Sequence, residues 1–366
     1  MFAYDLSRRF EAIGVTVGTV YLYPHTGDGA LPLHEYDRCL KGMERHPFER
    51  LPGFEPLLMA KVVRSIRRFR PDIVQVNGAR TVKYGAAARI LSRANWKLVY
   101  RNIGMASHWH RWRGSVAAYR KVIIPQMDGV IGVSAASLAD VSEFYGLRAP
   151  SEVILNGVSP DRITPTISRS EFRRANGVRD DDILLLSVGS LDSAKRPDRF
   201  LRVLSRLGDR LPQVRAWIVG DGPQRAETER YAAELGVTGR VRFFGSRDDV
   251  ADFMQAADIF VMTSDTEGVP AVVLEAGLMG LPVVAPRVGG LSECIIDGET
   301  GVLVPPGDEV RMAEVISRLS SEPDSRKRLG TAGREWVRGH LTIDHIAEQY
   351  LAFYRDLLDH RVAVPA

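Results

Sequence analysis

Two glutamates, Glu267 and Glu275, lie eight positions apart around the predicted start of a helix. Glu267 follows the predicted strand Ile259–Met262, and Glu275 falls one or two turns into the helix after it. In an open α/β sheet, ligands bind beyond the carboxyl ends of the strands. The free backbone N–H groups around Val269–Val272 suit a diphosphate, and a carboxylate on each side could bind sugar and ribose hydroxyls. Taken alone, the same spacing also fits surface acids on a helix.

A cation upstream of these acids is the second chemical signal. Lys195 stands in the segment Lys195-Arg196-Pro197-Asp198. Taken alone, it would be a solvated lysine at the start of a helix. Glycines that recur between the predicted elements are interpreted as turn residues, because glycine tolerates tight turns. They include Gly220, Gly222, Gly289 and Gly290.

Short apolar, β-branched runs alternate with longer amphipathic stretches along the chain. This alternation predicts parallel βαβ units with buried strands. The predicted strands are Val15–Tyr21, Ile73–Val76, Lys97–Tyr100, Gly129–Val133, Glu152–Leu155, Ile183–Val188, Arg215–Val219, Val241–Phe244, Ile259–Met262, Val283–Ala285 and Gly301–Val304. The predicted helices include Leu57–Phe69, Arg199–Leu207, Pro223–Leu235, Asp248–Ala256, Val272–Met279 and Ile343–Leu358.

The length of 366 residues, against roughly 150 for a typical domain, predicts two domains. The segment Asn156–Asp181 is rich in Pro, Thr, Ser and Asp, so we interpret it as the linker and the entry to the second domain. We expect an α/β protein with two Rossmann-like domains, at residues 1–158 and 159–342. The remaining residues, 343–366, should form a helix that packs back onto the first domain.

The beginning of the chain departs from a doubly wound domain, which normally opens with a strand and a tight glycine turn. Here the amphipathic stretch Phe2–Ile13 comes first, and the strand Val15–Tyr21 follows it at once. We therefore expect the N-terminal domain to lack its first strand and glycine loop. Either the start of the chain is misassigned, or the domain is short.

The ordered set of motifs resembles the retaining glycosyltransferases of family 4, which have the GT-B fold. The resemblance covers most of the chain and is dense over Val153–Gly307. The segments that carry it, besides Lys195-Arg196-Pro197-Asp198, are Val188-Gly189-Ser190-Leu191, Val219-Gly220-Asp221-Gly222-Pro223, Ser264-Asp265-Thr266-Glu267-Gly268-Val269-Pro270, Gly280-Leu281-Pro282-Val283, Gly289-Gly290-Leu291-Ser292-Glu293 and Asp297-Gly298-Glu299-Thr300-Gly301.

The resemblance implies a role for each matching residue. Glu267 matches an acid that faces the donor sugar, Glu275 an acid that binds ribose, and Lys195 a lysine that neutralises the donor diphosphate. Such a cation suits a departing nucleoside diphosphate, and the family usually needs no metal. Relatives often carry arginine in place of Ser190, and Arg196 could supply that charge instead. The other implied donor-binding positions are Gly189 and Gly268, then Val269 and Pro270, where the family's backbone amides approach the donor, and Gly245, Ser246 and Arg247, which border the base.

The first half of the chain offers candidates for the acceptor side. Many relatives carry histidine just after the strand equivalent to Lys97–Tyr100, where this chain reads Arg101-Asn102-Ile103-Gly104. The nearest histidines, His108 and His110, could be acceptor-side or sugar-side groups, or merely polar groups on a loop. Asn77 occupies a second position that is often histidine in the family.

The net charge of +4 has much of its excess in the first half, in two basic clusters. Either they form a solvated face, or they attract anionic lipid head groups or an acidic acceptor. No nucleic-acid-binding module accompanies the charge, so we expect no nucleic-acid partner. The clusters are Arg64, Arg67, Arg68 and Arg70, and then His108–Arg113 with Arg120 and Lys121.

No run approaches the roughly 20 apolar residues that cross a bilayer, and no secretory signal is visible. The two cysteines, Cys39 and Cys294, have no metal-type spacing and are interpreted as reduced thiols. We therefore expect a cytoplasmic protein. If the basic face binds lipid, the protein would also contact the inner face of the membrane peripherally.

The expected reaction is transfer of a hexose, with retained configuration, from a UDP- or GDP-sugar to a hydroxyl acceptor. The acceptor would be a polysaccharide or a lipid-linked glycan precursor, and we expect no metal and no cofactor beyond the donor as co-substrate. Two alternatives stay open, since fold does not fix function. One is a non-catalytic nucleotide-sugar-binding protein, and the other is an epimerase or phosphorylase on the same scaffold. The sequence has no strand–G-x-G-x-x-G–helix unit, which disfavours a dinucleotide oxidoreductase.

Overall fold

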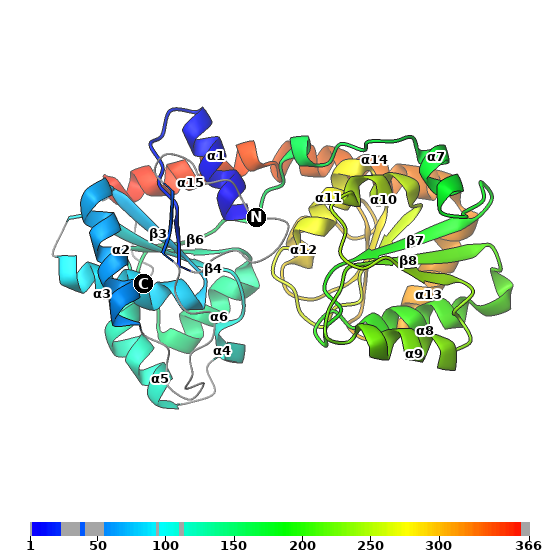
Figure 1. The fold of residues 1–366 in the computed structure, drawn as a ribbon, viewed down its shortest axis with the longest axis horizontal. Helices are drawn as coiled ribbons and strands as arrows, with labels where there is room; N and C mark the ends of the chain where they lie inside the picture. The colour runs from blue at the N-terminus through cyan, green and yellow to red at the C-terminus, as the bar shows by residue number, and fades with distance from the viewer. Residues whose placement is uncertain (1, 23–36, 41–54, 93–94, 110–112, 360–366) are drawn as a thin grey trace. The chain divides into compact units, whose positions relative to one another are not determined.

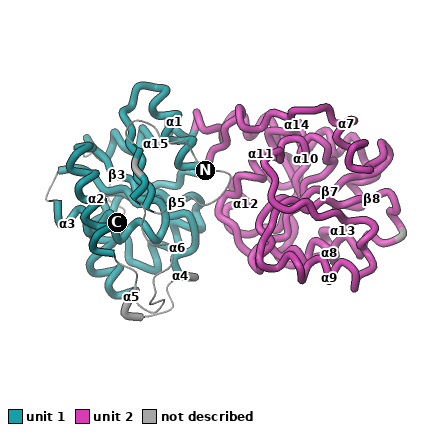
Figure 2. The backbone as a smooth tube through the Cα atoms, viewed as in Figure 1, with its two compact units in different colours: residues 1–155, 346–366 teal, residues 156–345 magenta. Residues whose placement is uncertain are grey.

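The computed structural model describes residues 2–22, 37–40, 55–92, 95–109 and 113–359. They form two compact units, Met1–Leu155 with Ile346–Ala366, and Asn156–His345 (Figure 2). Each unit holds its own parallel sheet flanked by helices (Figure 1). The predicted α/β class with two parallel-sheet units is confirmed. The chain passes between the units at 155–156 and 345–346, whereas the sequence suggested residues 158 and 342.

The N-terminal unit has a four-stranded parallel sheet in the order β3-β4-β5-β6. Its core joins residues of strands and helices, such as Leu58, Val82, Leu98, Val130 and Val141. The sheet is formed by β3 (Ile73–Asn77), β4 (Lys97–Asn102), β5 (Gly129–Gly132) and β6 (Ser151–Val153). The helices are α2 (Pro56–Phe69), α3 (Ala79–Ser92), α4 (Ala106–Trp109), α5 (Arg113–Ala118) and α6 (Ala135–Tyr145), with short π and 3-10 turns at Tyr119–Ile123 and Ile124–Gln126.

The amphipathic stretch that opens the chain forms α1 (Phe2–Ala12), but the strand predicted at Val15–Tyr21 is wrong over residues 15–19. Only β1 (Val20–Tyr21) is a strand, and it pairs with β2 (Arg38–Cys39) in a separate two-stranded sheet. Val15 remains 36% exposed, so the β-branched run has no core to bury it. Strand propensity without a buried face does not make a strand.

The C-terminal unit has a six-stranded parallel sheet in the order β12-β11-β10-β7-β8-β9. In Figure 1, α8, α9 and α13 cover one face of this sheet, and α10, α11 and α14 cover the other. The strands are β7 (Ile183–Val188), β8 (Val214–Val219), β9 (Val241–Phe243), β10 (Ile259–Val261), β11 (Val283–Pro286) and β12 (Val302–Val304). The helices are α7 (Arg169–Ala175), α8 (Pro197–Leu207), α9 (Arg225–Glu234), α10 (Val250–Ala256), α11 (Ala271–Met279), α12 (Leu291–Cys294), α13 (Glu309–Ser321) and α14 (Pro323–His340), with 3-10 turns at Pro160–Arg162 and Gly208–Arg210.

The last helix, α15 (Ile343–Leu358), packs on the N-terminal sheet. Arg101 Nε donates to Tyr350 Oη over 2.9 Å, which links β4 to the helix. Gly129 at the start of β5 leaves room for it, because a Cβ there would lie 2.7 Å from Leu357 Cδ1. The chain therefore returns to its first unit after completing the second.

Candidate functional site

The loops that follow β7 and β10 meet where the strand order of the C-terminal sheet reverses. β7 and β10 are neighbours, with Leu185 opposite Ile259, and their connections run outward to α8 and α11. In a doubly wound sheet, ligands bind in the crevice at such a switch point. Lys195 lies in the first of these loops and Glu267 in the second. The topology thus brings the predicted cation and the first predicted acid together.

Lys195 and Glu267 form a direct ion pair. Lys195 Nζ lies 2.7 Å from Glu267 Oε1 and 2.9 Å from Oε2, and Ser264 Oγ donates to Oε1 over 2.5 Å. The Glu267 side chain is 6% exposed, whereas the Lys195 side chain is 33% exposed. The acid is therefore held in place, while the ammonium keeps an open side toward an incoming anion.

The start of α11 adds backbone donors beside this pair. The N–H groups of Gly268, Val269, Ala271 and Val272 have no hydrogen-bond acceptor among the residues that the structure describes. A helix N-terminus with such groups and its positive dipole end suits an anion. Pro270 is the N-cap residue and has no N–H, so it cannot supply one of the amides expected there.

A third loop, between β11 and α12, supports the backbone that carries Glu267. Gly289 has a φ of +51°, and a Cβ there would lie 1.7 Å from the Glu267 carbonyl oxygen. Gly290 N–H donates to the Gly268 carbonyl oxygen over 3.0 Å. These glycines therefore do more than allow a tight turn: only a residue without a side chain lets the two loops approach so closely.

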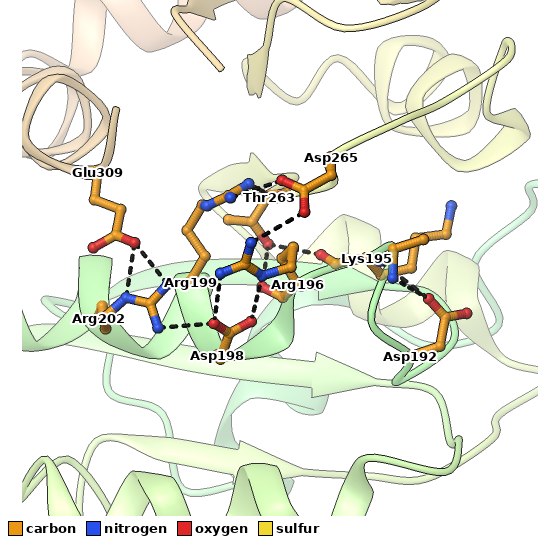
Figure 3. Close-up of polar contacts among 10 residues, drawn as sticks. Asp192, Lys195, Arg196, Asp198, Arg199, Arg202, Thr263, Asp265 and Glu309 are labelled. Carbon is orange, nitrogen blue, oxygen red and sulfur yellow. Dashed lines mark hydrogen bonds and ion pairs between the residues drawn. The ribbon is translucent and has the colours of Figure 1, made fainter. Parts of the chain in front are cut away.

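Arg196, the candidate second cation, is bound by two carboxylates. It is the N-cap residue of α8, in a left-handed conformation with a φ of 53°. Its guanidinium donates to both Asp198 oxygens, at 3.0 and 2.9 Å, and to Asp265 Oδ2 at 3.0 Å (Figure 3). These hydrogen bonds, first from Asp198 and then Asp265, raise the pKa of Arg196 above its ordinary value. Arg196 therefore faces two carboxylates where Lys195 faces one, and its role as the substitute for arginine at Ser190 stays a prediction.

Gly189 and Ser190 line a small cavity together with Lys195. The loop after β8 approaches Gly189 closely, because a Cβ on Gly220 would lie 1.9 Å from the Gly189 carbonyl oxygen. Glu275 lies half-buried in the second turn of α11. Four of the predicted donor-binding positions therefore belong to elements that start or end at the switch point.

The three predicted base-side residues lie in the loop after β9. Gly245 accepts a hydrogen bond from Gly220 N–H over 2.7 Å, which connects that loop to the one after β8. Ser246 is exposed, and Arg247 pairs with Asp249, with Nη2 2.6 Å from Oδ2. The ion pair with Asp249 orients the Arg247 guanidinium and also neutralises its charge.

The acceptor-side candidates all belong to the N-terminal unit. Asn77 ends β3, and its Oδ1 accepts a hydrogen bond from Gln75 Nε2 over 3.2 Å. His108 lies in α4, but its side chain is outside the described part of the chain, as is all of His110. The start of α4 is fixed by Asp140, whose carboxylate accepts from Ser107 N–H and Oγ.

Residues 168–336 match the family model for glycosyl transferases group 1, and residues 1–162 match the model for Glycosyltransferase Family 4. The chain belongs to the group 1 glycosyltransferases. The predicted recognition and the GT-B fold are thereby confirmed.

Two relatives of this chain are named as glycosyltransferases that build lipopolysaccharide or glycolipid. The chain is 39% identical over 142 residues to the lipopolysaccharide core biosynthesis glycosyltransferase LpsE of Rhizobium meliloti (strain 1021), covering 39% of this chain and 42% of that protein. It is 30% identical to the GDP-mannose-dependent α-(1-6)-phosphatidylinositol monomannoside mannosyltransferase of Mycolicibacterium smegmatis (strain ATCC 700084 / mc(2)155), covering 70% and 71%. The match spans only 49 to 61% of the length of four other curated relatives.

A solved structure of the same fold is Anabaena HepE in complex with UDP and glucose. It superposes with a TM-score of 0.76 at 25% identity, covering 87% of this chain and 86% of that one.

Among the described residues of this chain, no helix is long and apolar enough to span a membrane. The same residues contain no group of three or more His, Cys, Asp or Glu side chains arranged to hold a metal ion.

Several residues that shape the site of this group 1 chain were not found from the sequence. Ser264 binds Glu267 directly, and Asn156 Nδ2 donates to the Val269 carbonyl oxygen over 2.6 Å. Arg199 and Asp265 form an ion pair behind Lys195. Ser264 and Asp265 lie within the quoted motif, so a closer analysis of that motif could have indicated them. Arg199 becomes recognisable only through the fold, as does the contact of Asn156 with Val269.

Proposed function

We propose that the protein transfers a hexose from a UDP- or GDP-sugar to a hydroxyl acceptor, with the anomeric configuration retained and without a metal ion. The observation that carries this proposal is the Lys195–Glu267 ion pair, which lies at the switch point of the sheet. The pair stands beside a helix start whose N–H groups are open to an anion.

The chemistry assigns a different task to each part of the site. The Lys195 ammonium, together with the N–H groups at the start of α11, would stabilise the negative charge that grows on the departing diphosphate. Glu267 would orient Lys195 and bind the donor sugar, because its carboxylate reaches the same point from the neighbouring loop. Glu275 would bind the ribose hydroxyls. A lysine and backbone amides can together do what a divalent cation does for a leaving group, which is why we propose no metal.

Relatives support the choice of donor class. The HepE structures contain UDP, and one contains UDP-glucose, while the Mycolicibacterium relative is described as GDP-mannose-dependent. LpsE is described as a lipopolysaccharide core enzyme, which fits a glycan or lipid-linked acceptor. We therefore propose that this chain acts in building a cell-surface polysaccharide or its lipid-linked precursor.

A lipid-linked acceptor would bring the protein to a membrane surface, and α2 offers a suitable face. Arg64, Arg67 and Arg68 are exposed along this helix, and Leu57 at its start is 72% exposed. Basic side chains beside exposed apolar ones favour anionic lipid. We propose peripheral contact of a cytoplasmic protein through this face. Co-sedimentation with phosphatidylglycerol vesicles, but not with phosphatidylcholine vesicles, tests this, and equal recovery from both would contradict it.

The transfer reaction is tested by supplying purified protein with UDP- and GDP-linked hexoses, with and without glycan acceptors. We expect release of a nucleoside diphosphate that depends on the acceptor, and a product with the donor's anomeric configuration by NMR. A changed sugar without any acceptor would indicate an epimerase. A requirement for inorganic phosphate would indicate a phosphorylase, and donor binding without turnover would indicate a binding protein.

A further inference from the structure

Behind Lys195, a second set of contacts joins the two loops of the site. Thr263 Oγ1 donates to the carbonyl oxygens of Lys195 and Arg196, over 3.1 and 3.0 Å. Asp265 N–H donates to the Ala194 carbonyl oxygen over 2.8 Å. Hydrogen bonds therefore join the loop after β10 to the loop after β7 at Lys195 and at the residues directly before and after it.

Arg199 anchors these contacts from the first turn of α8. Its side chain is only 8% exposed. Nη1 donates to the Thr263 carbonyl oxygen and Nη2 to Asp265 Oδ1, each over 2.7 Å (Figure 3). A buried guanidinium depends on such partners, because a charge without water or an acceptor is costly. Arg199 thus fixes both ends of the segment 263–265 relative to α8.

The carboxylate of Asp265 connects two arginines. Oδ1 accepts from Arg199, and Oδ2 accepts from Arg196 Nη1 over 3.0 Å. Burial acts to raise the pKa of Asp265, but the hydrogen bonds from Arg199 and Arg196 outweigh it, so the pKa lies below its ordinary value. Asp265 is therefore charged throughout the neutral range. In Figure 3 the Lys195 side chain points away from this cluster of arginines and acids.

We propose that Arg199 and Asp265 form a lock that sets the position of Lys195 relative to Glu267, and that Asp265 is a positioning residue for diphosphate binding. Asp265 acts through Ala194 and the fastened loop, not by touching the donor, and this inference rests on the proposed function. Position matters because a misplacement of about 1 Å in such a site can cost about 100-fold in rate.

The outer part of the same network offers a matched control. Arg202 on α8 donates to Asp198 Oδ2 over 2.8 Å and to Glu309 Oε1 over 2.7 Å. Glu309 begins α13, and within the described residues its carboxylate pairs with Arg202 and Arg206 of α8 and with neither loop of the site. Glu309→Gln therefore removes a network carboxylate, as Asp265→Asn does, but leaves the Lys195 loop untouched.

The test measures binding of UDP and GDP to the full chain by titration calorimetry, beside the melting temperature of each variant. Loss of a charge-assisted contact should make Asp265→Asn bind about tenfold more weakly, whereas Glu309→Gln should lower the melting temperature alone. Combined with Lys195→Ala, Asp265→Asn should weaken binding no further, because its effect passes through Lys195.

A second variant covers the case in which Asp265→Asn does not fold. Arg199→Lys keeps the charge but loses the fork that reaches Thr263 and Asp265 at once, so it should weaken binding similarly. Unchanged affinity in either folded variant, or an equal loss when Lys195 is already alanine, would overturn the lock. If the unaltered protein binds neither UDP nor GDP, the proposed function fails, and the lock fails with it.

Discussion

The side-chain amide of Asn156 donates a hydrogen bond to the carbonyl oxygen of Val269 over 2.6 Å. Asn156 is the first residue of the C-terminal unit, and Val269 directly precedes the N-cap of α11. The bond fixes the peptide from which the helix starts. The residue at the junction of the two units thus helps to orient the N–H groups that we assign to the diphosphate.

Replacing Asn156 by alanine should raise the KM for the donor about fivefold, since a neutral hydrogen bond contributes about 1 kcal/mol. Steady-state kinetics with varied donor measure this. Asn176→Ala is the matched control, because Asn176 Nδ2 also donates to a backbone carbonyl, that of Phe172, over 2.9 Å. A KM that changes equally in both variants would mean that Asn156 has no special part in donor binding.

Lys195→Ala should lower kcat by about 100-fold or more, because it removes a cation that stabilises the leaving group. Glu275→Ala should mainly raise the KM for the donor, since it removes a contact to the ribose, which does not react. Single-turnover and steady-state assays separate the two effects. Lys327→Ala, on an exposed lysine of α14, serves as the control. Normal turnover in both site variants would refute the assignment of the site.

Much of this site could be predicted from the sequence because its residues lie at the ends of buried strands. The apolar runs of β7 and β10 place Lys195 and Glu267 after neighbouring strands once the sheet order is known. The alternation of strands and helices predicts a parallel sheet, but the order of its strands comes from the structure. The family resemblance then supplies the roles of these two residues.

The remainder depends on contacts between residues distant in the chain. Arg196 was predicted as a possible second diphosphate cation, and its guanidinium binds Asp265, 69 positions away, as well as its neighbour Asp198. The run from Val15 failed as a strand because its burial depends on neighbours that the local pattern does not contain. Local patterns predict most of the buried strands and helices, but they predict neither a run that finds no buried face nor the pairing of a charge with a distant residue.

Gly289→Ala tests the close approach of the third loop. The added Cβ would lie 1.7 Å from the Glu267 carbonyl oxygen, so the loop that carries Glu267 must move. We expect weaker donor binding together with a lower melting temperature. Gly298→Ala is a strain-matched control, because Gly298 also has a positive φ, +78°, but has no atom within 4 Å of an added Cβ. It should cost only about 1–2 kcal/mol of backbone strain and leave donor affinity unchanged. Unaltered affinity in Gly289→Ala would contradict the supporting role of this loop.

Asp198 should make the stability of the protein depend on pH in acid. Burial acts to raise its pKa, but hydrogen bonds from Arg196 and Arg202 outweigh this and hold the pKa well below its ordinary value. A carboxyl group whose pKa is lower in the folded state contributes stability that is fully present above its unfolded pKa, about 3.9, and is lost as the pH falls toward the folded pKa. Asp198→Asn should therefore reduce the free energy of unfolding by a constant amount between pH 5 and pH 8, roughly one to four units above that unfolded pKa, and by less below about pH 4.

Urea titrations at several pH values measure this difference. Asp181→Asn, which removes the exposed partner of Arg179, should leave the free energy of unfolding nearly unchanged, because exposed ion pairs contribute little. High salt should reduce the Asp198 effect as well, since its side chain is 35% exposed and its ion pairs are partly screened. If the difference between the unaltered protein and Asp198→Asn stays constant down to pH 3, about one unit below the unfolded pKa, then Asp198 has the same pKa in the folded and unfolded states, and the two arginines do not lower it.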